Sequence, residues 1–268
     1  MNILILGDVC GISGMKAIKS NLKNIIKKNN IDFTIVNGEN AADNGKGITK
    51  KNVDDLINSG VDVITSGNHI WDQKEILEVI SSSDRVIRPE NLIKGQPGKG
   101  YEIFNVKEKK IAVINFIGNV FMKKSEDLFV AAQKLMNKIK LKENADFIVV
   151  DIHAEITSEK MALGHLLDGK VTSVVGTHTH VPTSDTKILQ NGTAYQTDLG
   201  MCGDYDSVIG MDKENSIKKF IKDPTAVQHF PSLGQASISG IIVEADEKTG
   251  LAKNVKQFIS GGVLKERN

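Results

Sequence analysis

Two histidines, His178 and His180, are separated by one residue at the end of an apolar segment of the chain. The segment is Val174-Val175-Gly176-Thr177, and a buried strand does not normally end in two imidazoles that follow a glycine. Imidazole is the commonest metal ligand in proteins, and it binds a metal in its neutral form. The pair therefore indicates a metal site at a strand end, although a single His-x-His pair is equally consistent with a structural role.

Four other segments share this pattern, in which an apolar, strand-like run stops abruptly at polar ligand groups. These groups are Asp8 after residues 2–6, Glu39 and Asn40 after 32–36, Asn68 and His69 after 61–65, and His153 at the end of 147–152. Each is weak alone, because polar residues at strand ends usually form turns or cap helices. Parallel strands place their carboxyl ends at one edge of a sheet, so we expect a single cluster of oxygen and nitrogen ligands.

The types of ligand indicate which metals such a cluster would hold. Carboxylate, carboxamide and imidazole groups without thiolate suit Mn, Fe or Zn. A structural zinc site would more often use cysteine, and the chain has only Cys10 and Cys202. Two adjacent cations need a shared carboxylate, for which Glu39 is the best candidate. Ions roughly 3.5–4 Å apart can hold a hydroxide and a phosphoryl oxygen at once.

The elements that must position these residues alternate between short strands and helices. Strands are expected at residues 2–6, 32–36, 61–65, 147–152 and 171–175, and helices at 15–28, 49–57, 71–81 and 125–140, with another helix between the last two strands. Three hairpins are expected, pairing 101–106 with 110–116, 187–189 with 193–196, and 237–245 with 253–259. Segment 200–211 is interpreted as an apolar loop. We expect an α/β protein that forms a single domain over residues 1–268, a layered α/β/β/α sandwich with two mixed sheets flanked by helices.

Composition limits the classes of function. The 268 residues are 40% apolar and carry a formal net charge of +1, which gives no broad basic surface for extended nucleic acid. No apolar stretch is long enough to cross a bilayer, and the N-terminus lacks the features of a signal peptide. Two cysteines fit a reducing compartment, so we expect a cytoplasmic protein. Because the near-neutral charge disfavours extended nucleic acid, we expect a small-molecule partner. The apolar character of 200–211 also fits a homo-oligomer.

The order of these motifs resembles the calcineurin-like metallophosphoesterase superfamily, and more closely its bacterial YmdB-like branch. Superfamily motifs are Gly7-Asp8, Gly67-Asn68-His69 and Gly176 to His180. The closer match spans nearly the whole chain and is carried by longer segments, namely 38–42, 67–72, 88–91, 153–160, 176–181, 197–203 and 207–211. Members of this branch are cyclic-nucleotide phosphodiesterases with a dinuclear iron or manganese centre.

The resemblance implies a division of the ligands between two metals. Asp8, Glu39, Asn40 and His180 would hold the first metal, and Glu39, Asn68, His153 and His178 the second. His69 would be the general acid. Two positions depart from the wider superfamily, because Glu39 replaces an aspartate and Cys10 stands where the motif Asp-x-His has its histidine. Asn40 would supply the missing ligand.

The expected activity is hydrolysis of small 2′,3′-cyclic nucleotides by a dinuclear-metal phosphodiesterase, with Fe or Mn as the ions and Zn as an alternative. A metal-bridging hydroxide would attack phosphorus while His69 protonates the leaving ribose oxygen. Two alternatives remain open at this point. One is a phosphomonoesterase or nuclease with the same metal centre, and the other is a regulatory protein that senses a nucleotide through its metals.

Several other residues have supporting or alternative roles. Asp151 and Glu155 flank His153 in sequence and are expected to orient the ligands. His229 fits either the substrate cleft or loop packing. For Trp71, core packing is favoured over stacking on a base, and for Cys10 a role as a small buried filler is favoured over redox chemistry.

Overall fold

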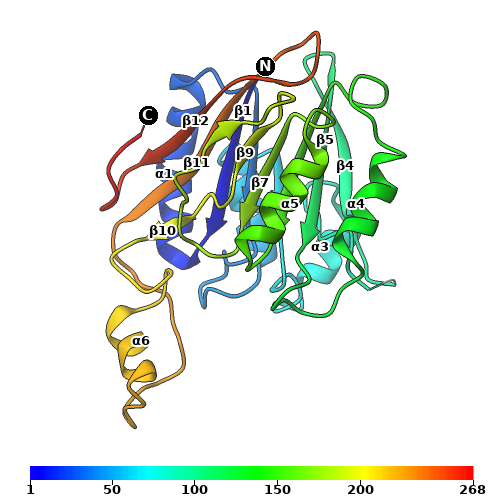
Figure 1. Ribbon diagram of the computed structural model, residues 1–268. Helices are drawn as coiled ribbons and strands as arrows, with labels where there is room; N and C mark the ends of the chain where they lie inside the picture. The colour runs from blue at the N-terminus through cyan, green and yellow to red at the C-terminus, as the bar shows by residue number, and fades with distance from the viewer. Residues whose placement is uncertain (94, 268) are drawn as a thin grey trace.

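Two six-stranded β-sheets packed face to face form the centre of the protein in the computed structural model, which describes residues 1–93 and 95–267 (Figure 1). The first sheet has the order β12-β11-β10-β1-β2-β3, and the second β4-β5-β6-β7-β9-β8. The strands of the first are β1 (Asn2–Val9), β2 (Phe33–Asn37), β3 (Val63–Thr65), β10 (Met201–Asp204), β11 (Ala236–Ala245) and β12 (Ala252–Ser260). Those of the second are β4 (Tyr101–Val106), β5 (Lys109–Ile117), β6 (Phe147–His153), β7 (Ser173–Thr177), β8 (Lys187–Ile188) and β9 (Ala194–Gln196).

Alternation along the buried strands builds the layers. In β1, Ile3 and Ile5 join a core that they share with Val113 and Val149 of the opposite sheet. Leu4 and Leu6 point the other way, into a core formed with helices. Successive side chains of a strand face opposite sides of its sheet, so a strand that is apolar throughout must be covered on both faces.

Helices cover the outer face of each sheet. Helices α1 (Gly11–Lys28), α2 (Lys50–Asn58) and α3 (Ile76–Ser82) contribute to the core outside the first sheet. Helices α4 (Leu128–Met136) and α5 (Thr157–Leu167) cover the second sheet, and α6 (Lys213–Phe220) stands apart from both sheets (Figure 1). The layered α/β/β/α architecture expected from the sequence is therefore confirmed.

The strand registers bring the polar strand ends to a common level. Strands β1, β2 and β3 are parallel, and Asp8 pairs with Asn37, which pairs with Thr65. In the second sheet β5, β6 and β7 are parallel, and His153 pairs with Thr177. The loops that follow these strands therefore emerge at one end of the sandwich.

Four predicted elements differ from the structure. The helix expected over 15–28 begins earlier, at Gly11. The helix expected over 71–81 begins only at Ile76, because residues 71–75 form a loop in which Asp72 contacts His69 and the Gln73 amide donates to the Lys46 carbonyl. The helix expected over 125–140 shortens to α4, whose N-terminus is capped by Asp127. Segment 200–211, interpreted as a loop, contains β10, which pairs with the last residues of β1.

Other local predictions are confirmed. The helix expected over 49–57 is present as α2, which Thr49 caps in a reciprocal capping box with Asn52. All three expected hairpins are present as antiparallel pairs. In the described ranges, no helix is long and apolar enough to span a membrane.

Candidate metal centre

The seven side chains predicted as metal ligands come from five segments that the fold gathers at one end of the sandwich. Asp8 belongs to β1 and His153 to β6, whereas the others lie in the loops after β2, β3 and β7. Asp8, Glu39 and His153 are almost completely buried, at 0–1% exposure. A concentration of buried ionisable groups is costly to a fold unless the groups are paired or bind a cation.

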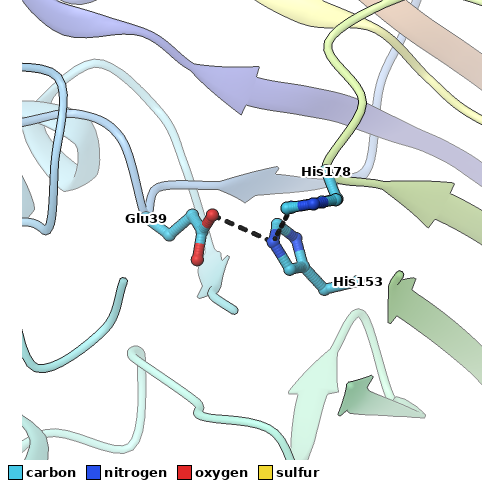
Figure 2. A group of neighbouring side chains, drawn as sticks. All are labelled: Glu39, His153 and His178. Carbon is cyan, nitrogen blue, oxygen red and sulfur yellow. Dashed lines mark hydrogen bonds and ion pairs between the residues drawn. The ribbon is translucent and has the colours of Figure 1, made fainter. Parts of the chain in front are cut away.

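One nitrogen atom, Nε2 of His153, lies at the centre of the larger group (Figure 2). It is 2.9 Å from Glu39 Oε1, 3.0 Å from His178 Nδ1 and 3.1 Å from Asn68 Oδ1. A proton on this nitrogen points at one acceptor at a time, whereas a metal ion can be bound by all four atoms. Glu39, His153 and His178 have the geometry of a group that could hold a metal ion.

The charges in this group are strongly coupled. Burial opposes ionisation of Glu39, but the charge and hydrogen bond of His153 lower its pKa to about 2. Burial likewise opposes charging of His153, but Glu39 dominates and raises the His153 pKa to about 9. Burial and the positive charge of His153 lower the His178 pKa to about 3. Without a metal, a proton on His153 therefore supplies the positive charge that a cation would otherwise bring.

Outer contacts orient the two imidazoles. His153 Nδ1 is 3.0 Å from Thr177 Oγ1, and this hydroxyl donates to Asp151 Oδ1 at 2.8 Å. A proton held at Nδ1 leaves Nε2 free as the ligand atom. His178 Nε2 lies 3.0 Å from Glu155 Oε2. The orienting roles expected for Asp151 and Glu155 thus have matching contacts.

A second group is formed by Asp8, Asn40 and His180. The Nδ1 of His180 bonds to the Ile209 carbonyl at 2.8 Å, which leaves Nε2 directed at Asn40 Oδ1, 3.2 Å away. Asp8 Oδ2 accepts from the His178 backbone N–H, but Asp8 Oδ1, 4.0 Å from His180 Nε2, has no hydrogen-bond partner among the described residues. An orphaned buried carboxylate oxygen beside an imidazole and an amide oxygen fits a cation site.

His69 lies at the wall of a pocket of about 410 Å³ that is also lined by Glu39, Asn40, His178 and His180. Its backbone N–H donates to Glu39 Oε2 at 2.9 Å, and its ring Nδ1 is 2.7 Å from Asp72 Oδ2. The predicted general acid is therefore tied to a predicted metal ligand and faces a space that a small molecule can enter. The contact with Asp72 was not foreseen from the sequence.

A buried ion pair supports the loop that carries both histidines. Lys160 Nζ and Asp198 Oδ2 are 2.7 Å apart at 0% and 1% exposure, and the same oxygen accepts from the backbone N–H of Thr179. His178 and His180 have φ angles of +100° and +65°, in a region of backbone conformation that residues other than glycine rarely adopt. The bond at Thr179 therefore holds a strained turn between two predicted ligands. Sequence patterns missed this pair, because a lysine within a helix normally faces solvent.

The remaining singled-out residues divide by location. His229 lines the pocket. Trp71 packs against the core outside the first sheet, as favoured from the sequence. Cys10 is buried, and burial raises the pKa of its thiol to about 12, so it remains a protonated, unreactive side chain.

We expect Lys160→Met to destabilise the protein by about 3–5 kcal/mol, because it leaves the Asp198 carboxylate buried without its partner. The double variant Lys160→Met/Asp198→Asn should recover much of this loss but bind Mn²⁺ more weakly than the wild type. Urea denaturation and metal titration measure the two effects. The control is Lys19→Met, which breaks the exposed Lys19–Asp55 pair and should change stability by less than about 1 kcal/mol. Equal losses in the two single variants would refute a special role for Lys160.

Asp8→Asn should stabilise the metal-free protein at pH 7.5 while weakening its binding of metal. Burial raises the Asp8 pKa from 3.8 to about 6, so the folded state resists an ionisation that the unfolded state undergoes readily. Stability is therefore lost as pH rises from about 4 to about 6, and the advantage of Asp8→Asn should shrink towards pH 4. Urea midpoints in the presence of a chelator test this, with the exposed Asp54→Asn as control. A wild type that is more stable than Asp8→Asn at pH 7.5 would contradict it.

Known proteins resemble this chain over its full length. A 2′,3′-cyclic-nucleotide 2′-phosphodiesterase of Bacillus subtilis (strain 168) is 43% identical over 259 residues, which are 97% of each chain. A hypothetical protein from Thermus thermophilus has a crystal structure with a TM-score of 0.90 and 37% identity, covering 98% of this chain and 100% of that one. The crystal structure of a novel phosphatase from Mycoplasma pneumoniae has a TM-score of 0.90 and 36% identity, covering 97% and 93%.

The YmdB-like family profile matches residues 4–258, which include all seven predicted ligands and His69. Identity at this level over whole chains reflects common descent and not only a shared fold. The fold is metallophosphoesterase-like, as the sequence resemblance implied. This chain belongs to the YmdB-like family.

Proposed function

We propose that this protein is a dinuclear-metal phosphodiesterase that hydrolyses small 2′,3′-cyclic nucleotides. The observation that carries the proposal is the convergence of two ligand groups, one around His153 Nε2 and one around Asp8, beside a pocket that His69 also lines. The relative from Bacillus subtilis, which carries this activity in its name, supports the same substrate class.

The donor set fits two cations. Asp8, Asn40 and His180 would hold one ion, Asn68, His153 and His178 the other, and Glu39 both. When bound, ions such as Fe or Mn, with Zn as an alternative, acidify water and neutralise charge on phosphoryl oxygens. Glu39 suits the shared position because its two oxygens already make separate contacts, Oε1 with His153 and Oε2 with the N–H of His69.

His69 would act as the general acid. The Asp72 carboxylate at Nδ1 would orient the His69 ring and leave Nε2 as the atom that donates the proton. The leaving group is the ribose 2′ oxygen if this protein follows its Bacillus subtilis relative, and the product is then a nucleoside 3′-phosphate. The short link between His69 and Glu39 keeps the proton donor close to the reacting phosphate.

Hydrolysis assays on metal-loaded protein test the activity itself. Adenosine 2′,3′-cyclic phosphate should be opened to adenosine 3′-phosphate, and the product should not be converted further to adenosine. Parallel assays contain a phosphomonoester and single-stranded RNA. Faster turnover of the monoester or of internal RNA linkages would replace the proposal with a phosphomonoesterase or a nuclease, and no turnover of any substrate would favour a regulatory protein.

Replacing the general acid should remove turnover but leave the metals in place. For His69→Ala we expect a fall in kcat of about 10²–10⁴-fold on the cyclic nucleotide. The loss should be much smaller on bis(p-nitrophenyl) phosphate, because p-nitrophenolate leaves without protonation. Metal content is measured on the same samples, and His165→Ala, an exposed histidine on α5, serves as control. Equal losses on both substrates would remove His69 from the role of acid.

A further inference from the structure

The pocket beside the predicted metal ligands is also lined by residues that belong to neither ligand group. They include Lys46, Lys219 and His229, together with the apolar side chains of Ile209 and Phe220. Ile209 and Phe220 are 54% and 80% exposed, respectively. A site for one cyclic phosphate held by metal ions would not require these basic groups.

The two lysines are available to bind an anion. Neither Lys46 nor Lys219 forms an ion pair with any residue in the described ranges, whereas Lys213, on the same helix as Lys219, pairs with Asp206. The described residues that line the pocket include a single carboxylate, Glu39, which belongs to the predicted metal site. Burial and the positive charges of Lys219 and Lys46 lower the His229 pKa, which places the three groups within electrostatic reach of one another.

The segment that presents Lys219 and Phe220 is held in a defined shape although it projects from the body of the protein (Figure 1). Asp212 caps α6, and the Asn215 side chain bonds to the backbone N–H of Val227 at 2.9 Å and to its carbonyl at 3.2 Å. The backbone N–H of Asp212 bonds to the Phe230 carbonyl at 3.0 Å. These contacts join α6, which carries Lys219, to the segment that carries His229, so these two elements are held together before a ligand arrives.

We propose that the part of the pocket lined by Lys46, Lys219 and His229, called here the outer site, binds a second phosphate, on the 5′ oxygen of the nucleotide whose cyclic phosphate reacts at the metals. The inference rests on the proposed function and narrows its substrate class. Lys46, Lys219 and His229 bind the 5′-side phosphate, and Phe220 offers a face on which an adjoining base stacks. Preferred substrates are therefore nucleoside 2′,3′-cyclic phosphates that carry a 5′-phosphate, either as a free monoester or as the last internucleotide linkage of a short RNA.

Three ligands separate these possibilities. They are adenosine 2′,3′-cyclic phosphate, its 5′-phosphorylated form, and the dinucleotide ApA ending in a 2′,3′-cyclic phosphate. On Mn²⁺-loaded protein, kcat/KM should be roughly tenfold higher for the second and third than for the first, since one charge-assisted contact is worth about that factor. A gain with the dinucleotide alone would assign the site to RNA ends, and a gain with the monoester alone to mononucleotides. Equal values for all three would overturn the proposal.

Neighbouring lysines on α6 provide a matched comparison. Lys219→Gln and Lys46→Gln should each abolish most of the preference while changing turnover of the plain cyclic nucleotide by less than about twofold. Lys218→Gln removes the same charge one residue away, outside the pocket lining, and should preserve the preference. An equal effect of Lys218→Gln and Lys219→Gln would show that only overall charge matters and would overturn the site.

Calorimetry on metal-depleted protein separates this inference from the proposed activity. Because the lysines are not metal ligands, the 5′-phosphorylated ligand should still bind about tenfold more tightly than the plain one, and Lys219→Gln should remove the difference. Should neither cyclic nucleotide be hydrolysed, the proposed activity fails while this binding preference remains a direct test of the outer site. Equal binding of the two ligands would refute the outer site whether or not the protein is an active phosphodiesterase.

Discussion

The structure depends on one electrostatic constraint: two buried carboxylates, Asp8 and Glu39, lie among three imidazoles at the end of a β-sandwich and need positive charge. Without a metal, a proton on His153 supplies that charge for Glu39, but Asp8 Oδ1 has no hydrogen-bond partner in the described part of the chain. Burying charges without partners opposes folding, so a buried cluster of carboxylates and imidazoles is typical of a functional site such as a metal site. A cation held by His153 Nε2 and the three atoms around it, from Glu39, Asn68 and His178, would explain why these four atoms converge.

The surrounding fold holds the strained backbone that carries two of the predicted ligands. His178 and His180 both have positive φ angles, and the intervening Thr179 is bonded to a buried Lys160–Asp198 pair. A glycine also allows close packing against His153, because a Cβ at Gly67 would lie 2.2 Å from its ring. Strain and a buried ion pair both lower stability relative to an apolar core. This end of the sandwich is therefore less stable than an apolar core would be, but its contacts fix the positions of the predicted ligands. Such pre-organisation is what a catalytic metal centre requires.

The layered fold and the candidate ligands could both be predicted from the same feature of the sequence, the apolar runs that end in polar groups. Runs such as residues 2–6 and 147–152 are largely apolar, which indicates strands covered on both faces, and each ends in ligand groups. Non-local contacts were less accessible. The sequence around Trp71 does not indicate that α3 begins only at Ile76. The preceding loop is held by contacts with His69 and with the carbonyl of Lys46, which is distant in sequence. The burial of Lys160 and the shared pocket of Lys46 and Lys219 likewise arise from residues far apart in sequence.

The most direct measurement of the central claim is elemental analysis combined with anomalous X-ray diffraction on protein replenished with Mn²⁺. We expect two ions per chain, roughly 3.5–4 Å apart, with Glu39 between them. One ion should be bound by Asp8 and His180, and the other by His153 and His178. Protein that takes up no Mn²⁺, or that holds the ion away from Glu39, would contradict it.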